Sequence, residues 1–80
     1  MALRKGAMCL IDYSPLWVTM KHKQITQYDL YTRYGISRSL LDKLRHNRNI
    51  EVLTIDRLCS ILNCRVEEVM RYVPDDNDKN

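Results

Sequence analysis

One stretch, from Ile25 to Arg48, constrains the fold of this chain more than any other part of its sequence. It reads as two short helices joined by a turn that contains Gly35. Thr26 can cap the first helix, because its hydroxyl can accept a hydrogen bond from an unpaired amide of the first helical turn. Gly35 stands where that helix ends and where a left-handed residue is wanted, a conformation that glycine adopts without a Cβ penalty.

The second helix of this stretch should span residues 37–45, with Ser37 as its cap. The side that we expect to face a core carries Leu40, Leu41 and Leu44. The opposite side carries Arg38, Ser39, Asp42 and Lys43. A helix, a glycine turn and a second helix with a polar, basic outer face form the pattern of a helix-turn-helix that reads DNA.

Eighty residues suffice for one small domain with a single core. Because the apolar fraction is 45% and the chain has no Phe, that core must come mainly from Leu, Ile, Val, Met and some Tyr. We expect three parts along the chain: a flexible arm over residues 1–9, a DNA-binding domain over residues 10–74 and an acidic, disordered tail over residues 75–80.

The flanking sequence predicts three further helices, so that five helices surround one core. Ser14 should cap a helix with Pro15 at its first position, where the missing amide costs nothing. Thr54 should cap a helix that ends at Asn63, a residue that tolerates the left-handed conformation. A last helix should run from about Val66 to Tyr72. The expected fold class is therefore all-α with a central helix-turn-helix.

Basic charge is concentrated on the same central stretch. The whole chain has a formal charge of +3, but between Lys21 and Arg48 seven lysines or arginines stand against two aspartates. A basic stripe on such a motif is the electrostatic footprint of a polyanionic partner, which here would be double-stranded DNA. The alternative is an ordinary solvated helix face.

Metal, cofactor and enzyme chemistry find little support in the sequence. Cys9, Cys59 and Cys64 form no C-x-x-C, and both histidines lie far from any cysteine, so we expect neither a disulfide framework nor a zinc site. We see no converging carboxylates, no nucleophile with a partner base and no phosphate loop, and we expect no catalysis, no cofactor and no small-molecule substrate. No apolar run approaches a membrane span, so a cytoplasmic location is expected.

Between about residues 11 and 74 the chain resembles the lambda-repressor-like DNA-binding domains, the Cro/cI or XRE-type helix-turn-helix family. More narrowly, it is similar to small single-domain transcriptional regulators of Gram-positive bacteria, phages and mobile elements. The order and spacing of the following segments carry the resemblance: Tyr13-Ser14-Pro15-Leu16-Trp17, Ile25-Thr26-Gln27-Tyr28-Asp29-Leu30, Tyr34-Gly35-Ile36-Ser37-Arg38-Ser39, Leu41, Leu44, His46-Asn47, Leu58-Cys59-Ser60-Ile61-Leu62-Asn63-Cys64 and Val66-Glu67-Glu68-Val69.

The resemblance implies a role for several side chains. Those that would face base edges in the major groove are Arg38, Ser39 and Lys43. Those that would hold the DNA backbone are Gln27, Ser37, His46, Asn47 and Arg48, and Gln27 would also brace the recognition helix. Side-chain chemistry agrees for the basic pair, since arginine and lysine can donate to guanine O6 and N7.

Two positions depart from the family pattern. Arg65 stands where the family usually has a short polar cap before its last helix, so that helix could start elsewhere or Arg65 could serve a phosphate or partner contact. Leu40 stands where the family commonly has Ser or Thr. It could contact a thymine methyl, pack against the edge of the core or support a protein interface.

Two functions fit these observations. The first is a sequence-specific transcriptional regulator, expected to be a repressor, that reads DNA as a homodimer. The second is an antitoxin-like or adaptor protein whose main partner is another protein. The candidate dimer surfaces are the predicted last helix with Tyr72 and Val73, and the segment from Leu10 to Tyr13. Together they could pair as extended strands across a two-fold axis.

Overall fold

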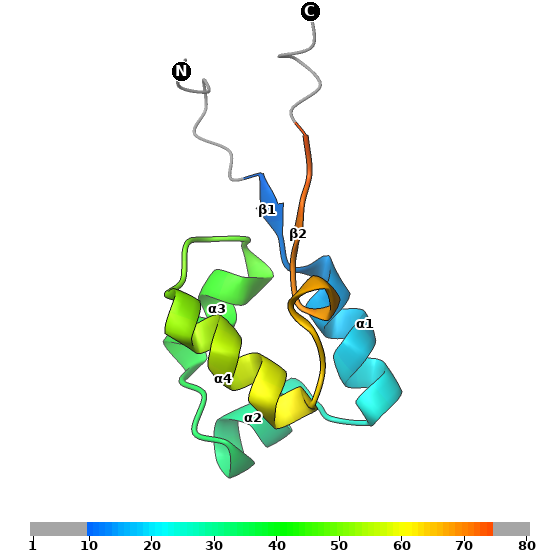
Figure 1. Ribbon diagram of the computed structural model, residues 1–80. Helices are drawn as coiled ribbons and strands as arrows, with labels where there is room; N and C mark the ends of the chain where they lie inside the picture. The colour runs from blue at the N-terminus through cyan, green and yellow to red at the C-terminus, as the bar shows by residue number, and fades with distance from the viewer. Residues whose placement is uncertain (1–9, 75–80) are drawn as a thin grey trace, which may run out of the picture.

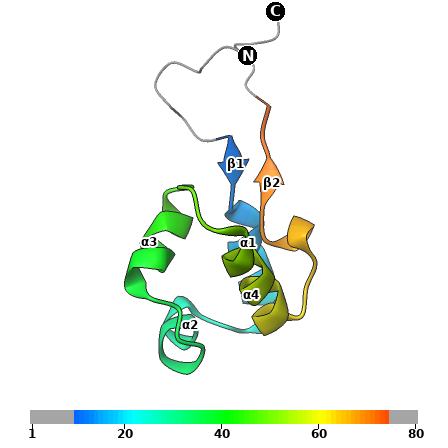
Figure 2. The ribbon, with the colours of Figure 1, turned by 60° about the vertical axis from the view of Figure 1, so that its left-hand side comes forward.

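The computed structural model describes residues 10–74. The arm predicted over residues 1–9 and the tail predicted over residues 75–80 lie outside the described residues. Within these limits the chain forms the α-helices α1 (Ser14–Lys23), α2 (Gln27–Arg33), α3 (Arg38–Arg45) and α4 (Val52–Leu62). A short 3-10 helix, η2 (Val66–Glu68), follows α4. Strands β1 (Ile11–Asp12) and β2 (Arg71–Tyr72) pair antiparallel and project from the helical body at the end opposite α2 (Figures 1 and 2).

All four α-helices contribute buried side chains to one core, which explains why so short a chain can fold. Its buried apolar side chains are Tyr13, Leu16, Met20, Leu30, Ile36, Leu41, Leu44, Ile55, Leu58, Leu62 and Val69. Trp17 and Leu40 are half-buried and pack against this cluster. Each fully buried Leu, Ile or Val contributes roughly 1.5–3 kcal/mol of hydrophobic stabilisation relative to an exposed one.

The predicted caps of α2 and α3 are confirmed. Thr26 Oγ1 accepts a hydrogen bond from the Asp29 amide at 3.0 Å, and Asp29 Oδ2 accepts one from the Thr26 amide at 2.9 Å. This reciprocal pair is a capping box, and the bond from the Thr26 amide is the main reason that the pKa of the Asp29 carboxyl lies below its ordinary value. Ser37 Oγ accepts from the Leu40 amide at 3.1 Å. Gly35 has the expected left-handed conformation, with φ +70°.

The predicted caps of α1 and α4 are wrong. Ser14 lies inside α1, and Asp12 takes the capping role instead, because Asp12 Oδ1 accepts from the Ser14 amide at 3.0 Å and from its hydroxyl at 2.6 Å. Thr54 lies inside α4, which begins at Val52 after Glu51. Val52 and Leu53 in this first turn are exposed, so they do not continue the pattern of buried residues from which the start of the helix was predicted.

The prediction of a fifth helix up to Tyr72 is also wrong, since only the short 3-10 helix η2 forms there and the chain is extended by Arg71. A helix continuing from Glu68 would use its carbonyl to accept from the amide four residues later. Here Thr19 Oγ1 donates to that carbonyl at 2.7 Å, from a buried position on α1. Val73 pairs its amide with the Leu10 carbonyl at 2.8 Å. The last segment therefore pairs with the first as a ribbon.

The described residues give no sign of a membrane span or a metal centre. None of the helices between residues 10 and 74 is long and apolar enough to cross a membrane. Nor do His, Cys, Asp and Glu side chains gather within that range in a group that could hold a metal ion. Cys59 and Cys64 are free and half-buried, and burial raises the pKa of the Cys64 thiol to about 11.

The Thr26 capping box gives a first test. Thr26→Ala should lower the free energy of unfolding by about 1 kcal/mol, because α2 then loses a side-chain acceptor at its first turn. Thr32→Ala is the matched control, since Thr32 is an exposed threonine of the same helix whose hydroxyl donates to the Tyr28 carbonyl one turn earlier. Urea denaturation followed by circular dichroism measures both. Equal stability of the two variants would contradict the capping role.

Candidate nucleic-acid interface

The outer side of α3 presents the three residues predicted to contact bases. Arg38, Ser39 and Lys43 are all exposed. Leu41 and Leu44, on the other side of the helix, are 4% and 0% exposed and anchor α3 in the core. Because the buried leucines fix the rotation of α3, the polar side must face away from the rest of the domain.

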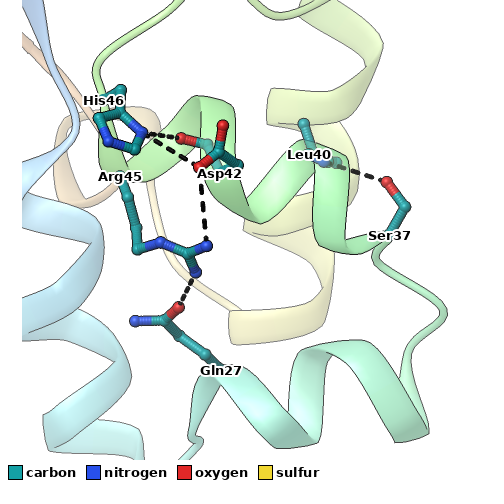
Figure 3. Close-up of polar contacts among 6 residues, drawn as sticks. All are labelled: Gln27, Ser37, Leu40, Asp42, Arg45 and His46. Atoms are coloured by element: carbon teal, nitrogen blue, oxygen red, sulfur yellow. Dashed lines mark hydrogen bonds and ion pairs between the residues drawn. The ribbon is translucent and has the colours of Figure 1, made fainter.

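Gln27 joins the start of α2 to the last turn of α3. Its Oε1 accepts a hydrogen bond from Arg45 Nη1 at 2.6 Å (Figure 3). Arg45 Nη2 also lies 3.9 Å from Asp42 Oδ1, a long contact between exposed groups that contributes little by itself. Gln27 is half-buried, so it acts as a strut between the two helices.

His46 lies against α3 through its neighbour Asp42. His46 Nδ1 is 2.8 Å from the Asp42 carbonyl oxygen and 3.3 Å from Asp42 Oδ1 (Figure 3). Both of these atoms are acceptors, so Nδ1 carries a proton. In a neutral ring Nε2 is then an acceptor, and it becomes a donor only when the ring is protonated. His46 can therefore donate to a phosphate through Nε2 only as an imidazolium.

The loop after α3 is pinned to the start of α1 by Tyr13. Asn47 is left-handed, with φ 54°, and its Oδ1 accepts from the Tyr13 amide at 2.9 Å. The Tyr13 hydroxyl donates to the Arg48 carbonyl at 2.8 Å, and the Tyr13 side chain is only 3% exposed. The loop is thus held in place while the Arg48 side chain stays exposed. The side-chain carbonyl of Asn47 is committed inside the domain, and its amide group is the part suited to an outside contact.

Two side chains of this surface, Tyr31 and Arg45, were not among the predicted site residues. The guanidinium of Arg38 lies over the ring of Tyr31 on α2, 4.6 Å from its centroid. That pair spans the turn, so no single-helix spacing could reveal it. Arg45 lies seven residues after Arg38, on the same side of α3, and this spacing could have identified it. A hollow of about 320 Å³ between the two helices is lined by Gln27, Tyr28, Tyr31, Arg38, Leu41 and Arg45.

The two unusual positions have structural explanations. Leu40 packs against the edge of the core, beside a hollow of about 270 Å³ between α3 and the start of α4. Arg65 precedes η2, and its amide donates to Glu68 Oε1 at 2.9 Å. The Glu68 carboxylate therefore supplies the acidic half of a capping box, and the Arg65 side chain remains exposed beside Glu67.

Comparison with known proteins agrees with this geometry. The family model for the Cro/C1-type HTH DNA-binding domain matches residues 15–75. No curated protein matches the chain significantly. Among solved structures, the chain is similar to the crystal structure of the transcriptional regulator VanUg, with a TM-score of 0.76 and 21% sequence identity, over 94% of this chain and 100% of that one. At this identity the likeness shows a shared fold.

The Asn47 link gives a second test. Asn47→Ala should lower the free energy of unfolding by about 2 kcal/mol, because it removes the acceptor of the Tyr13 amide and places a Cβ-bearing residue without a polar side chain in the left-handed region. Asn47→Gly keeps that conformation and should cost only about half as much. Chemical denaturation measures both values. Two variants as stable as the wild type would show that the loop does not depend on Asn47.

Proposed function

The chain belongs to the family of Cro/C1-type helix-turn-helix DNA-binding domains, and we propose that it regulates transcription by reading double-stranded DNA in a sequence-specific way. The observation that carries this proposal is α3, which exposes Arg38, Ser39 and Lys43 while its leucines are buried in the core. An α-helix with its side chains is about 10–12 Å in diameter, which suits a major groove about 12 Å wide.

Base reading is assigned to Arg38, Ser39 and Lys43. Arg38 and Lys43 can donate to guanine O6 and N7, and Ser39 can donate to or accept from either member of a base pair. Each good bidentate contact is worth about 1–3 kcal/mol of discrimination against a wrong base. The Arg38 guanidinium and the Lys43 ammonium are exposed and charged, so they form stronger hydrogen bonds than the Ser39 hydroxyl.

Backbone contact is assigned to Gln27, Ser37, His46, Asn47 and Arg48. Ser37 uses its oxygen as the acceptor for α3, which leaves its O–H to donate to a phosphate. Arg48 supplies an exposed guanidinium, and His46 supplies a donor when its ring is protonated. Such contacts fix the register of a protein on the duplex and carry no sequence information by themselves.

We further propose that the protein acts as a homodimer and represses by occupying its site. One small domain covers a short half-site, and helix-turn-helix dimers gain affinity by binding two half-sites about one helical turn apart. The ribbon of β1 and β2 is the proposed dimer contact. The two segments pair with each other inside one chain, so pairing across a two-fold axis would have to use an outer strand edge. The β2 edge is favoured, because Tyr72 is 59% and Val73 is 38% exposed.

Two exposed aliphatic side chains favour a second candidate function, in which the main partner is another protein. Val52 and Leu53, in the first turn of α4, are 82% and 76% exposed. Adjacent exposed aliphatic side chains of this kind are typical of protein contact surfaces. An adaptor or antitoxin-like protein would use them and would not need the cationic side chains of α3.

DNA binding is tested by fluorescence anisotropy with duplexes from upstream of the protein's own gene, between about 50 and about 200 mM salt. The wild type should prefer one duplex and lose affinity steeply with salt. Arg38→Ala combined with Lys43→Ala should weaken binding to that duplex by at least about 10-fold, because two base contacts are lost. Arg65→Ala, which removes an exposed arginine directly before η2, should leave binding unchanged.

Two results would contradict the assignment. Wild-type binding without sequence preference or salt dependence would exclude a sequence-specific regulator. A double variant that keeps its biological activity would favour the adaptor function instead.

The ribbon is tested by light scattering of Leu10→Asp and Val73→Asp variants. A charge on the ribbon should shift the protein from dimer to monomer, because desolvating a carboxylate at the contact is costly. Val52→Asp carries the same charge on exposed α4 and should stay dimeric. Circular dichroism checks that the helices of each variant persist. If both ribbon variants remain dimeric, the dimer contact lies elsewhere.

A further inference from the structure

The contact between Tyr31 and Arg38 joins the two helices of the motif on its outer surface. Tyr31 lies on α2, Arg38 is the first residue of α3, and the guanidinium carbon is 4.6 Å from the centroid of the ring. Tyr31 is 39% exposed, so its ring is not simply a core residue. At this distance the positive guanidinium is attracted by the negative face of the aromatic ring.

Arg38 occupies an electrostatically unfavourable place. A cation in the first turn of a helix is opposed by the positive end of the helix dipole, and the first turn of α3 contains no acidic residue. The two carboxylates of α2 and α3 lie beside other side chains: Asp29 beside Arg33, and Asp42 beside Arg45 and the His46 ring. Among the described residues, the Tyr31 ring is the group that lies against the Arg38 guanidinium and favours its charge.

The contact with Tyr31 uses only one side of the guanidinium. The guanidinium carbon lies over the ring, and Arg38 is otherwise exposed, so the N–H donors that point away from the ring stay available. An arginine held in this way can still form the two parallel hydrogen bonds that recognise guanine. The contact also limits the rotamers of a long side chain before DNA arrives, so that less freedom is lost on binding.

The surroundings hold this pair in one place. Tyr31 and Arg38 line the hollow between α2 and α3, above the buried Leu41. Elsewhere in the same hollow, Arg45 donates to Gln27. Besides the turn, the two helices are thus joined on this surface by an aromatic contact and a hydrogen bond, and the ring that supports Arg38 has a fixed position relative to α3.

We propose that Tyr31 is a specificity-determining residue, which acts by positioning the Arg38 guanidinium for the base that Arg38 reads. This inference rests on the proposed function and extends it to a residue of α2. Tyr31 itself reads no base. Its effect on sequence preference passes through Arg38 and disappears when Arg38 is removed.

The test compares base preference, measured by binding to duplexes substituted at each half-site position. Tyr31→Leu should reduce the preference at the Arg38 position by about 3-fold, as the loss of an exposed cation–π contact predicts. Tyr31→Phe keeps the ring face and should restore most of that preference. Tyr28→Leu removes a more exposed tyrosine of the same hollow and should leave the preference at that position unchanged. In an Arg38→Ala background, Tyr31→Leu should have no further effect.

A second measurement reports on the contact between Tyr31 and Arg38 in the absence of DNA. The Arg38 side-chain Nε–H relaxation should show an ordered group in the wild type and in Tyr31→Phe, and a mobile one in Tyr31→Leu. Full retention of the preference in Tyr31→Leu, while Arg38→Ala loses it, would overturn this inference and leave the proposed function standing. A Tyr31→Leu effect that persists without Arg38 would overturn the positioning role. Absence of any base preference in the wild type would overturn both proposals.

Discussion

The turn between α2 and α3 is the constraint on which the rest of the structure depends. Gly35 is left-handed, and Ile36 after it is fully buried with its amide bonded to the Leu30 carbonyl at 2.9 Å. Arg57 of α4 donates to the Tyr34 carbonyl at 2.5 Å, so the end of α2 is tied to a third helix. A Cβ at position 35 would lie 3.2 Å from Arg57 Nη2, so a side chain there would crowd this tie as well as strain the backbone. The angle between α2 and α3, and with it the direction of the exposed side of α3, follows from these contacts.

On this fixed frame the polar surface is built in a consistent way. Gln27 bonds to Arg45, and Tyr31 supports Arg38, so that side chains of α2 hold side chains of α3. Behind α3, Tyr13 at the start of α1 holds the loop that presents Arg48. Rigid presentation of cationic groups lowers the entropy lost on binding a polyanion. The interface that we propose is therefore ordered before any partner is bound.

The sequence predicted the local parts of this architecture because their causes are local. The caps at Thr26 and Ser37 and the left-handed Gly35 depend on residues within a few positions, and all three are confirmed. The predicted last helix failed because contacts with distant residues decided the outcome: Arg71 and Tyr72 pair with β1, and Thr19 donates to the Glu68 carbonyl from 49 positions away. The outer side of α3 was readable from helical periodicity, whereas its aromatic support from α2 requires the angle between two helices. The assignment of base and backbone contacts stays a prediction.

Backbone amide chemical-shift mapping tests the central claim most directly. Uniformly 15N-labelled protein would be titrated with a duplex from upstream of its own gene, at low salt. If α2 and α3 form the DNA-reading surface, the largest shifts should fall on residues 27–48, with little change in β1, β2 and η2. Shifts concentrated on the ribbon or on the first turn of α4, with the amides of α3 unmoved, would contradict the account.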